Sequence, residues 1–154
     1  TMARVGQAMG QGDPVLARQR GFLGISASLL LVVPSIVLIL AFPQWVAGLY
    51  TGDLAVIQAA LPLLLAAAML QIFDATYITA QGALRGLKDV NGPMLISLSF
   101  WVCGLPAAWL MGLVIGWGAV GLWWGMVFGV ALTAVLLVWR FHWRSARTIR
   151  ETRA

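Results

Sequence analysis

Hydrophobic residues form four long runs along the chain, separated by short polar segments. The runs cover residues 21–42, 54–84, 93–115 and 119–139. Each is long enough to cross a bilayer, which requires about 20 residues of helix. Each is apolar on all sides over most of its length, whereas a helix in a soluble core is amphipathic or shorter. Because lipid satisfies no backbone N–H or C=O group, the pattern predicts an all-α membrane protein with four transmembrane helices.

The composition agrees with this pattern. Of the 154 residues, 61% are hydrophobic and 10% are charged, against roughly 25% charged in a typical soluble domain. These values exclude an ordinary soluble protein, a disordered tail and a disulfide scaffold. The chain is long enough for one domain, and it has too few polar side chains to cover its apolar surface in water. The lipid bilayer is therefore its first expected partner.

The positive charges separate onto one side of a four-pass arrangement. Ten Lys and Arg outnumber five Asp and Glu. All ten lie in the segment 1–20, the loop after the second run, or the tail 140–154: Arg4, Arg18, Arg20, Arg85, Lys88, Arg140, Arg144, Arg147, Arg150 and Arg153. The positive-inside rule then predicts a multi-pass protein of the plasma (inner) membrane with both ends in the cytoplasm. Because the rule accounts for the basic excess, nucleic acid is not an expected partner.

The two ends are expected to lie outside the hydrocarbon. Residues 1–20 are polar and are expected to form a cytoplasmic loop or N-terminal segment. Residues 140–154 are expected to form a basic cytoplasmic tail, whose part after Arg144 frays in water or lies against anionic headgroups. Because Thr1 is not an initiator, either Met2 starts the protein or the sequence is part of a longer chain.

Asp74 is the one acidic residue within the four apolar runs. It lies eleven residues before Arg85, or roughly 16 Å along a helix. A charge at that depth costs about 2.5–3.5 kcal/mol on insertion scales. At about 100° per residue, Gln71, Tyr77 and Gln81 share a stripe of about 120° with Asp74. The stripe is expected to face a bundle interior or a wet cavity, with these three residues as its lining.

Three interpretations of Asp74 remain open from the residues alone. The carboxylate is a cation or proton site, since a desolvated carboxylate gains proton affinity and can exchange a proton for a cation. Alternatively it makes a structural hydrogen bond between helices. In the third interpretation the helix breaks earlier and Asp74 lies at the membrane interface.

Other features indicate packing rather than chemistry. Gly121, Gly125 and Gly129 line up on one face of the fourth run and allow close helix approach, within one chain or between subunits. Cys103 and His142 each stand alone, and no cluster of His, Cys and carboxylates has metal spacing. We therefore expect no structural metal and no cofactor. The chain also offers no nucleophile–base pair or phosphate loop, so it is not expected to be an enzyme.

Three stretches resemble the multidrug and toxic compound extrusion (MATE) family, especially its NorM-like branch. The first is RVGQAMGQGD at residues 4–13. The second comprises QIFDAT at 71–76, QGALRGLKD at 81–89 and Pro93. The third is GAVGLWWG at 118–125. They occur in the family's order and at its helix spacing, and they span nearly the whole chain.

The resemblance implies a role for the chain and for Asp74. It places the four helices as the last four of a twelve-helix antiporter, the C-terminal portion of the protein. Such antiporters exchange Na⁺ or H⁺ for organic, often cationic, drug-like compounds. Asp74 falls on the family's intramembrane aspartate, which binds the coupling cation or proton.

The chain departs from the family in what it lacks. The earlier helices are absent, and with them the family's other acidic ligand. We therefore expect this chain to need the missing N-terminal helices as partners. The alternative is a standalone four-helix membrane protein that acts as a homo-oligomeric small exporter or a structural subunit.

Overall fold

The computed structural model describes residues 1–153, and every regular element within them is a helix. The elements are α1 (Met2–Gly10), α2 (Pro14–Ala41), α3 (Pro43–Gly48), α4 (Leu54–Gly86), α5 (Asn91–Ser99), η1 (Phe100–Gly104), α6 (Leu105–Trp109), η2 (Leu110–Val114) and α7 (Gly118–Arg153). Four helices are long and apolar enough to cross a membrane, namely α2, α4, the composite Asn91–Val114 and α7. The predicted class, all-α with four transmembrane helices, is confirmed.

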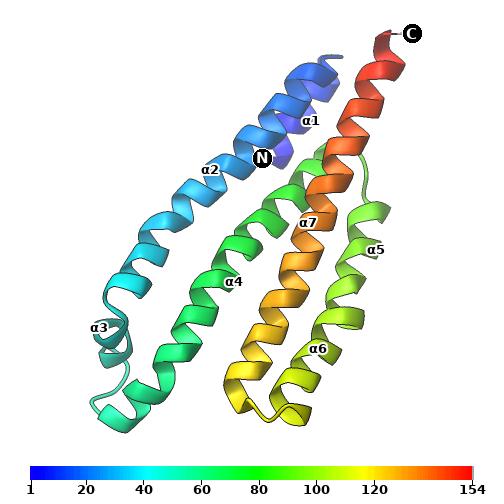
Figure 1. Ribbon diagram of the computed structural model, residues 1–154. Coiled ribbons are helices and arrows are strands. Elements are labelled where there is room, and N and C mark those ends of the chain that lie inside the picture. Colours follow the sequence, from blue (N-terminus) through cyan, green and yellow to red (C-terminus); the bar gives the residue numbers. More distant parts are fainter. Residues whose placement is uncertain (154) are drawn as a thin grey trace.

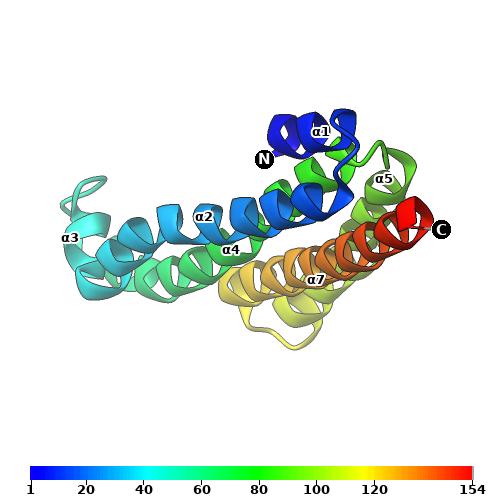
Figure 2. The same cartoon turned by 90° about the horizontal axis from the view of Figure 1, so that it is seen from above.

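The four long helices run side by side, with α4 and α7 in contact near the middle (Figure 1). Seen from above, the short α1 lies across one end of α2 and α4 (Figure 2). The loop after α4 and the C-terminus are at that same end. α3 and the turn before α7 are at the other end. We call these the basic end and the loop end, because the Lys and Arg residues lie in segments of the first.

The segment 1–20 is mostly helical. α1 buries Val5 and Ala8 against the basic end of the bundle. α2 begins at Pro14, seven residues before the apolar run. Asp13 caps it by accepting a hydrogen bond from the backbone N–H of Leu16 at 2.9 Å. Asp at the N-cap followed by Pro at the first helical position is a strong helix-start signal. It makes α2 begin before the hydrophobic run does.

Residues 140–153 of the predicted tail continue α7, so the fraying expected after Arg144 is not seen. Leu137 and Phe141 are fully buried in the core and Ser145 is nearly so. Their spacing of four residues extends the buried face past the apolar run. The sequence also has no Gly or Pro after Gly129 to stop the helix. Ala154, the last residue of the predicted tail, lies outside the described residues.

The third span is not a regular α-helix. Two π-helical turns, η1 and η2, flank α6, which carries Pro106 at its second position. The backbone N–H of Leu105 donates to the carbonyl of Phe100, five residues earlier. Proline supplies no N–H and its ring crowds the preceding turn, so a wider turn ahead of it relieves the clash. The prediction of a single helix over 93–115 missed this irregularity.

The three glycines of the predicted packing face, Gly121, Gly125 and Gly129, lie where α7 meets the third span. A Cβ on Gly125 would overlap the backbone of Ala108. A Cβ on Gly129 would lie 2.5 Å from the Cα of Gly104, and one on Gly121 would overlap the carbonyl of Met111. The two backbones approach this closely only because these positions carry no side chain. The glycine face is thus occupied by another helix of the same chain.

Candidate functional site

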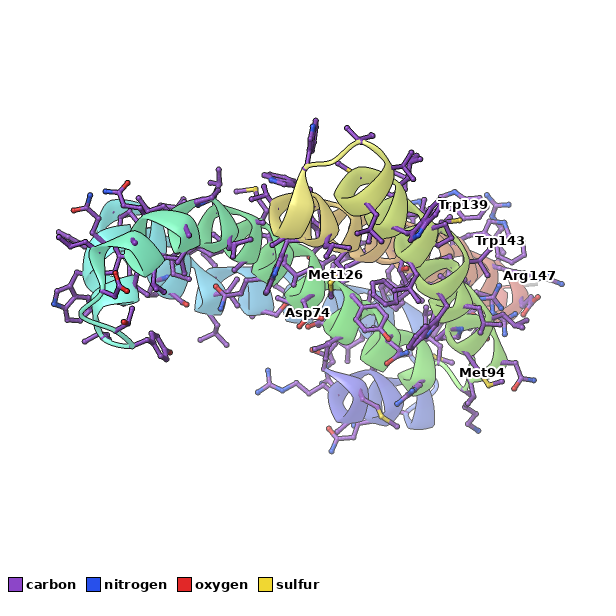
Figure 3. All side chains as sticks on the ribbon, turned by 90° about the horizontal axis from the view of Figure 1, so that it is seen from below. Asp74, Met94, Met126, Trp139, Trp143 and Arg147 are labelled. Carbon is purple, nitrogen blue, oxygen red and sulfur yellow. The ribbon has the colours of Figure 1, made fainter. Side chains whose placement is uncertain are left out.

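A hollow of about 310 Å³ opens between α4, the third span and α7. Asp74 lies on its wall, exposed to it from the middle of α4 (Figure 3). The other residues lining it are Tyr77, Ser97, Phe100, Trp101, Val130 and Thr133. α4 runs through this point without a break. The geometry therefore disagrees with the interpretation in which the helix ends before Asp74.

A hydrogen-bonded cluster adjoins Asp74 on the basic-end side. The hydroxyl of Ser97 donates to the carbonyl of Pro93 at 2.8 Å, which uses its single hydrogen. Tyr77 therefore donates to Ser97, with 3.4 Å between the two oxygens. The Nε2 of Gln81 also donates to Ser97, at 3.3 Å. These bonds join α4 to α5 and fix the direction of the Tyr77 hydroxyl.

Gln71 occupies a different position from the rest of the polar stripe. It does not line the hollow. Its Oε1 is buried and has no hydrogen-bond partner among the described residues. A buried acceptor without a donor costs about 1–3 kcal/mol. Of the four stripe residues, Asp74 and Tyr77 line the hollow. Gln81 does not line it but bonds to Ser97, which does, and Gln71 lies apart.

Two hydroxyl residues of the hollow were not predicted from the sequence. Ser97 and Thr133 each lie in a hydrophobic run, where a single hydroxyl residue commonly bonds to its own helix backbone. Both do so, and Thr133 donates to the carbonyl of Gly129 at 2.8 Å. Thr133 is also 3.0 Å from the hydroxyl of Ser99, across the contact between α7 and α5. The hydrophobic pattern did not mark either residue, because Ser97 and Thr133 meet the Asp74 stripe only when the helices pack together.

The π-helical turn η1 places two aromatic residues in the hollow. Phe100 and Trp101, at its start, both line the cavity and pack edge to face at 5.7 Å between ring centroids. Single π-turns inside helices are frequent at functional sites. The hollow thus combines one carboxylate, three hydroxyl groups and aromatic surface, which suits an organic cation or a small inorganic one.

A second polar centre, which was not predicted from the sequence, lies at the basic end. Asp89 is 5% exposed and forms a bidentate ion pair with Arg140 of α7, at 2.8 Å and 3.2 Å. Arg144 approaches the same carboxylate at 3.4 Å. Asp89 also accepts the backbone N–H of Gly92 at 3.2 Å. This centre, the Asp89 clamp, ties the loop after α4 to the last helix.

Local backbone geometry places Asp89 for this role. α4 ends in a Schellman motif, in which Lys88 takes the left-handed conformation (φ 61°). The N–H of Asp89 then donates to the carbonyl of Leu84 at 3.0 Å. Gly92 provides room for the guanidinium of Arg140, because a Cβ at that position would overlap it.

Electrostatics keep Asp89 ionised. Burial raises the pKa of its carboxyl, but the hydrogen bonds from Arg140 and Gly92 and the charges of Arg140 and Arg144 outweigh this effect. The net result is a pKa below the usual value of 3.8. The clamp is therefore a true ion pair at neutral pH.

Comparison with known proteins agrees with these features. A family model described as MatE matches residues 1–110, including α4 with Asp74 and its neighbours. This chain belongs to the MatE family. The match ends within the third span, and α7 lies beyond it.

Curated relatives are similar to this chain over nearly its whole length, including α7. The chain is 38% identical over 152 residues to a probable multidrug resistance protein NorM of Pseudomonas putida, covering 95% of this chain and 33% of that protein. It is 40% identical over 157 residues to a multidrug resistance protein NorM of Burkholderia vietnamiensis, covering 97% and 34%. A probable NorM of Pseudomonas aeruginosa is 36% identical over 160 residues. The chain spans about a third of the length of the curated relatives it matches.

Proposed function

We propose that this chain is part of a cation-coupled multidrug efflux antiporter, in which Asp74 binds the coupling Na⁺ or H⁺. One observation carries the proposal. The one carboxylate in the middle of the four long helices opens onto a hollow lined by hydroxyl and aromatic side chains. The MatE match and the multidrug resistance names of the relatives support the same function.

The rest of the transporter completes the site. The relatives are about three times as long as this chain, and we propose that the chain corresponds to their C-terminal part. Asp74 is exposed, so its carboxylate is available to further helices. We propose that those helices supply a second acidic ligand and close the cavity.

Proton or cation exchange at Asp74 supplies the coupling step. An ionised Asp74 attracts a cation, whereas occupation by H⁺ or Na⁺ neutralises it. Since the charge in this low-dielectric region changes with occupancy, so does the affinity for an organic cation in the same cavity. Aromatic and apolar lining with few directed polar contacts gives broad specificity for drug-like compounds.

The test replaces Asp74 in the complete native polypeptide. Asp74→Asn keeps the shape and the polarity but removes the charge that binds a cation. We expect efflux of a cationic dye to fall to the level of cells without the transporter, while the protein remains at wild-type amounts in the membrane. In proteoliposomes, a Na⁺ gradient and a pH gradient applied separately identify the coupling ion. Wild-type efflux by the Asn variant would refute the role of Asp74.

A matched control removes a carboxylate elsewhere. Glu151 lies on the exposed end of α7 and pairs with Arg147 at 2.8 Å. Glu151→Gln is expected to leave efflux unchanged. If both variants lose efflux equally, the loss reflects membrane assembly and does not support a coupling site.

The alternative, a homo-oligomeric small exporter or structural subunit, used the glycine face of α7 as its subunit contact. That face packs against the third span of the same chain. A second copy therefore has no access to it without unpacking the bundle, which favours the transporter proposal.

A further inference from the structure

An apolar groove lies on the face of α4 that points away from Asp74. Its volume is about 470 Å³, and α2, α4 and α7 form its walls. The residues that define it are Phe22, Leu29, Ile72, Phe73, Val138 and His142. At about 100° per residue, Ile72 and Thr76 lie about 160° around α4 from Asp74. The groove is thus on the opposite side from the polar hollow, and we call it the α2–α7 groove.

The basic-end mouth of this groove is polar. The Nη2 of Arg18 donates to the Nδ1 of His142 at 3.3 Å. Because arginine cannot accept a hydrogen bond, a neutral His142 carries its hydrogen on Nε2, which remains able to donate. No carboxylate in the part of the chain that the structure describes forms an ion pair with Arg18. A second hollow of about 660 Å³, lined by Arg18, Gln19 and Ser26, shares Phe22 with the groove.

The groove is short enough to lie within a single membrane leaflet. From Phe22 to Leu29 is seven residues, or roughly 10 Å along α2. Half of the hydrocarbon core is about 15 Å thick. Trp139, on the groove wall, is 67% exposed. Trp143 and Arg147 follow it along α7 (Figure 3), with the guanidinium 5.7 Å from the Trp143 ring. Such residues are typical of the headgroup level.

We propose that the α2–α7 groove binds an anionic phospholipid, with Arg18 and His142 contacting its phosphate and an acyl chain lying between α2, α4 and α7. A phospholipid has an anionic headgroup and apolar acyl chains. The groove matches this arrangement, because Arg18 and His142 lie at its basic-end mouth and its walls are apolar. An apolar transmembrane helix laid over the same surface would fill the groove but would cover Arg18 without supplying an anion, which is costly. The inference goes beyond the proposed function and does not depend on it.

The test measures lipid retained by the complete native polypeptide. The protein is purified in a neutral detergent with equimolar phosphatidylglycerol and phosphatidylcholine, and bound lipid is counted by native mass spectrometry. The neutral detergent is kept in large excess over both lipids, so the micelle surface carries little charge and retained lipid reports a discrete site. We expect phosphatidylglycerol to be retained in preference to phosphatidylcholine. Arg18→Ala should weaken that retention roughly fivefold, the effect of one basic residue near an anionic headgroup.

Matched variants separate the groove from general charge and bulk. Arg150→Ala removes the same charge from an exposed position on α7 and should leave retention unchanged. Val135→Trp fills the groove from a residue that is 62% exposed, and should abolish retention. Val37→Trp adds the same bulk to α2 at a residue that is 56% exposed and outside the groove, and should not change it.

Several outcomes would overturn the proposal. These are wild-type protein without preference for the anionic lipid, equal loss in the two arginine variants, and retention unaffected by Val135→Trp. Displacement of the lipid by soluble glycerol phosphate as readily as by phosphatidylglycerol would show that the apolar groove contributes nothing. Because the readout is bound lipid, loss of transport through Asp74 would not affect it.

Discussion

At the scale of single residues, the chain carries two functionally informative carboxylates in opposite environments. Asp74 lies in the middle of a long apolar helix and is exposed to a hollow. Asp89 lies in a loop and is buried with two arginines. The sequence identifies Asp74 because a carboxylate within an apolar run is rare and its insertion into the bilayer costs free energy. It does not identify the Asp89 clamp, since Arg140 is 51 residues away and only the folded bundle brings the two together.

The Asp89 clamp leads to a stability prediction with a defined pH dependence. Asp89→Asn removes the charge and leaves Arg140 without its partner, while an amide oxygen still accepts from Gly92. We expect a loss of about 1.5–3 kcal/mol in the free energy of unfolding at pH 7, the range for hydrogen bonds to charged groups. The measurement is unfolding of the complete polypeptide in mixed detergent micelles, followed by circular dichroism.

The pH dependence follows from the direction of the pKa shift. The pKa of Asp89 is lowered in the folded state, so its contribution is fully present above the unfolded value of about 3.8 and is lost as the pH falls through the folded value. The difference between wild type and Asp89→Asn should therefore shrink when the same measurement is made near pH 3. As a control, Glu151→Gln breaks an exposed pair and should cost at most about 0.5 kcal/mol. A difference that persists at low pH would contradict the ion-pair account.

At the scale of elements, the hydrophobic pattern predicts the existence of the four spanning helices but not their ends. Apolar runs indicate which residues lie in the bilayer, whereas helix ends depend on caps and on tertiary contacts. α2 starts early because Asp13 and Pro14 form a cap. α7 continues because Phe141 and Ser145 are buried. The π-turns around Pro106 escape the pattern altogether, since apolar composition does not distinguish π from α turns.

The glycine face of α7 gives a prediction at this scale. Gly125→Ala places a Cβ where the backbone of Ala108 lies, and backbone cannot rotate away as a side chain can. We expect a loss of about 1–3 kcal/mol in unfolding free energy, typical of overpacking. Gly48→Ala is the control, because a Cβ there meets nothing within 4 Å. Detergent unfolding compares the two, and equal stability of both variants would contradict the close approach of α7 to the third span.

At the scale of the whole molecule, the fold divides into a basic end and a loop end. An even number of long helices returns the C-terminus to the end at which α2 begins (Figure 1). The sequence predicts this separation from charge counts alone, since the Lys and Arg residues avoid the segments at the loop end. It does not predict how the polar hollow and the apolar groove are divided between opposite faces of α4, because this requires the packing of α2, α5 and α7 around that helix.

Membrane orientation is the prediction that belongs to this scale. The positive-inside rule places the basic end in the cytoplasm. Cys103 is the one cysteine of the chain, so in the complete polypeptide a Cys103→Ser background without other cysteines allows single cysteines to be introduced at Thr51, in the loop end, and at Glu151, in the basic end. In intact cells, a membrane-impermeant maleimide should label Thr51→Cys and not Glu151→Cys, and permeabilised cells should show labelling of both. Labelling of Glu151→Cys in intact cells would reverse the orientation, and partial labelling of both would indicate dual insertion. The complete charge separation opposes either result, because inverting the chain would carry ten basic side chains across the bilayer.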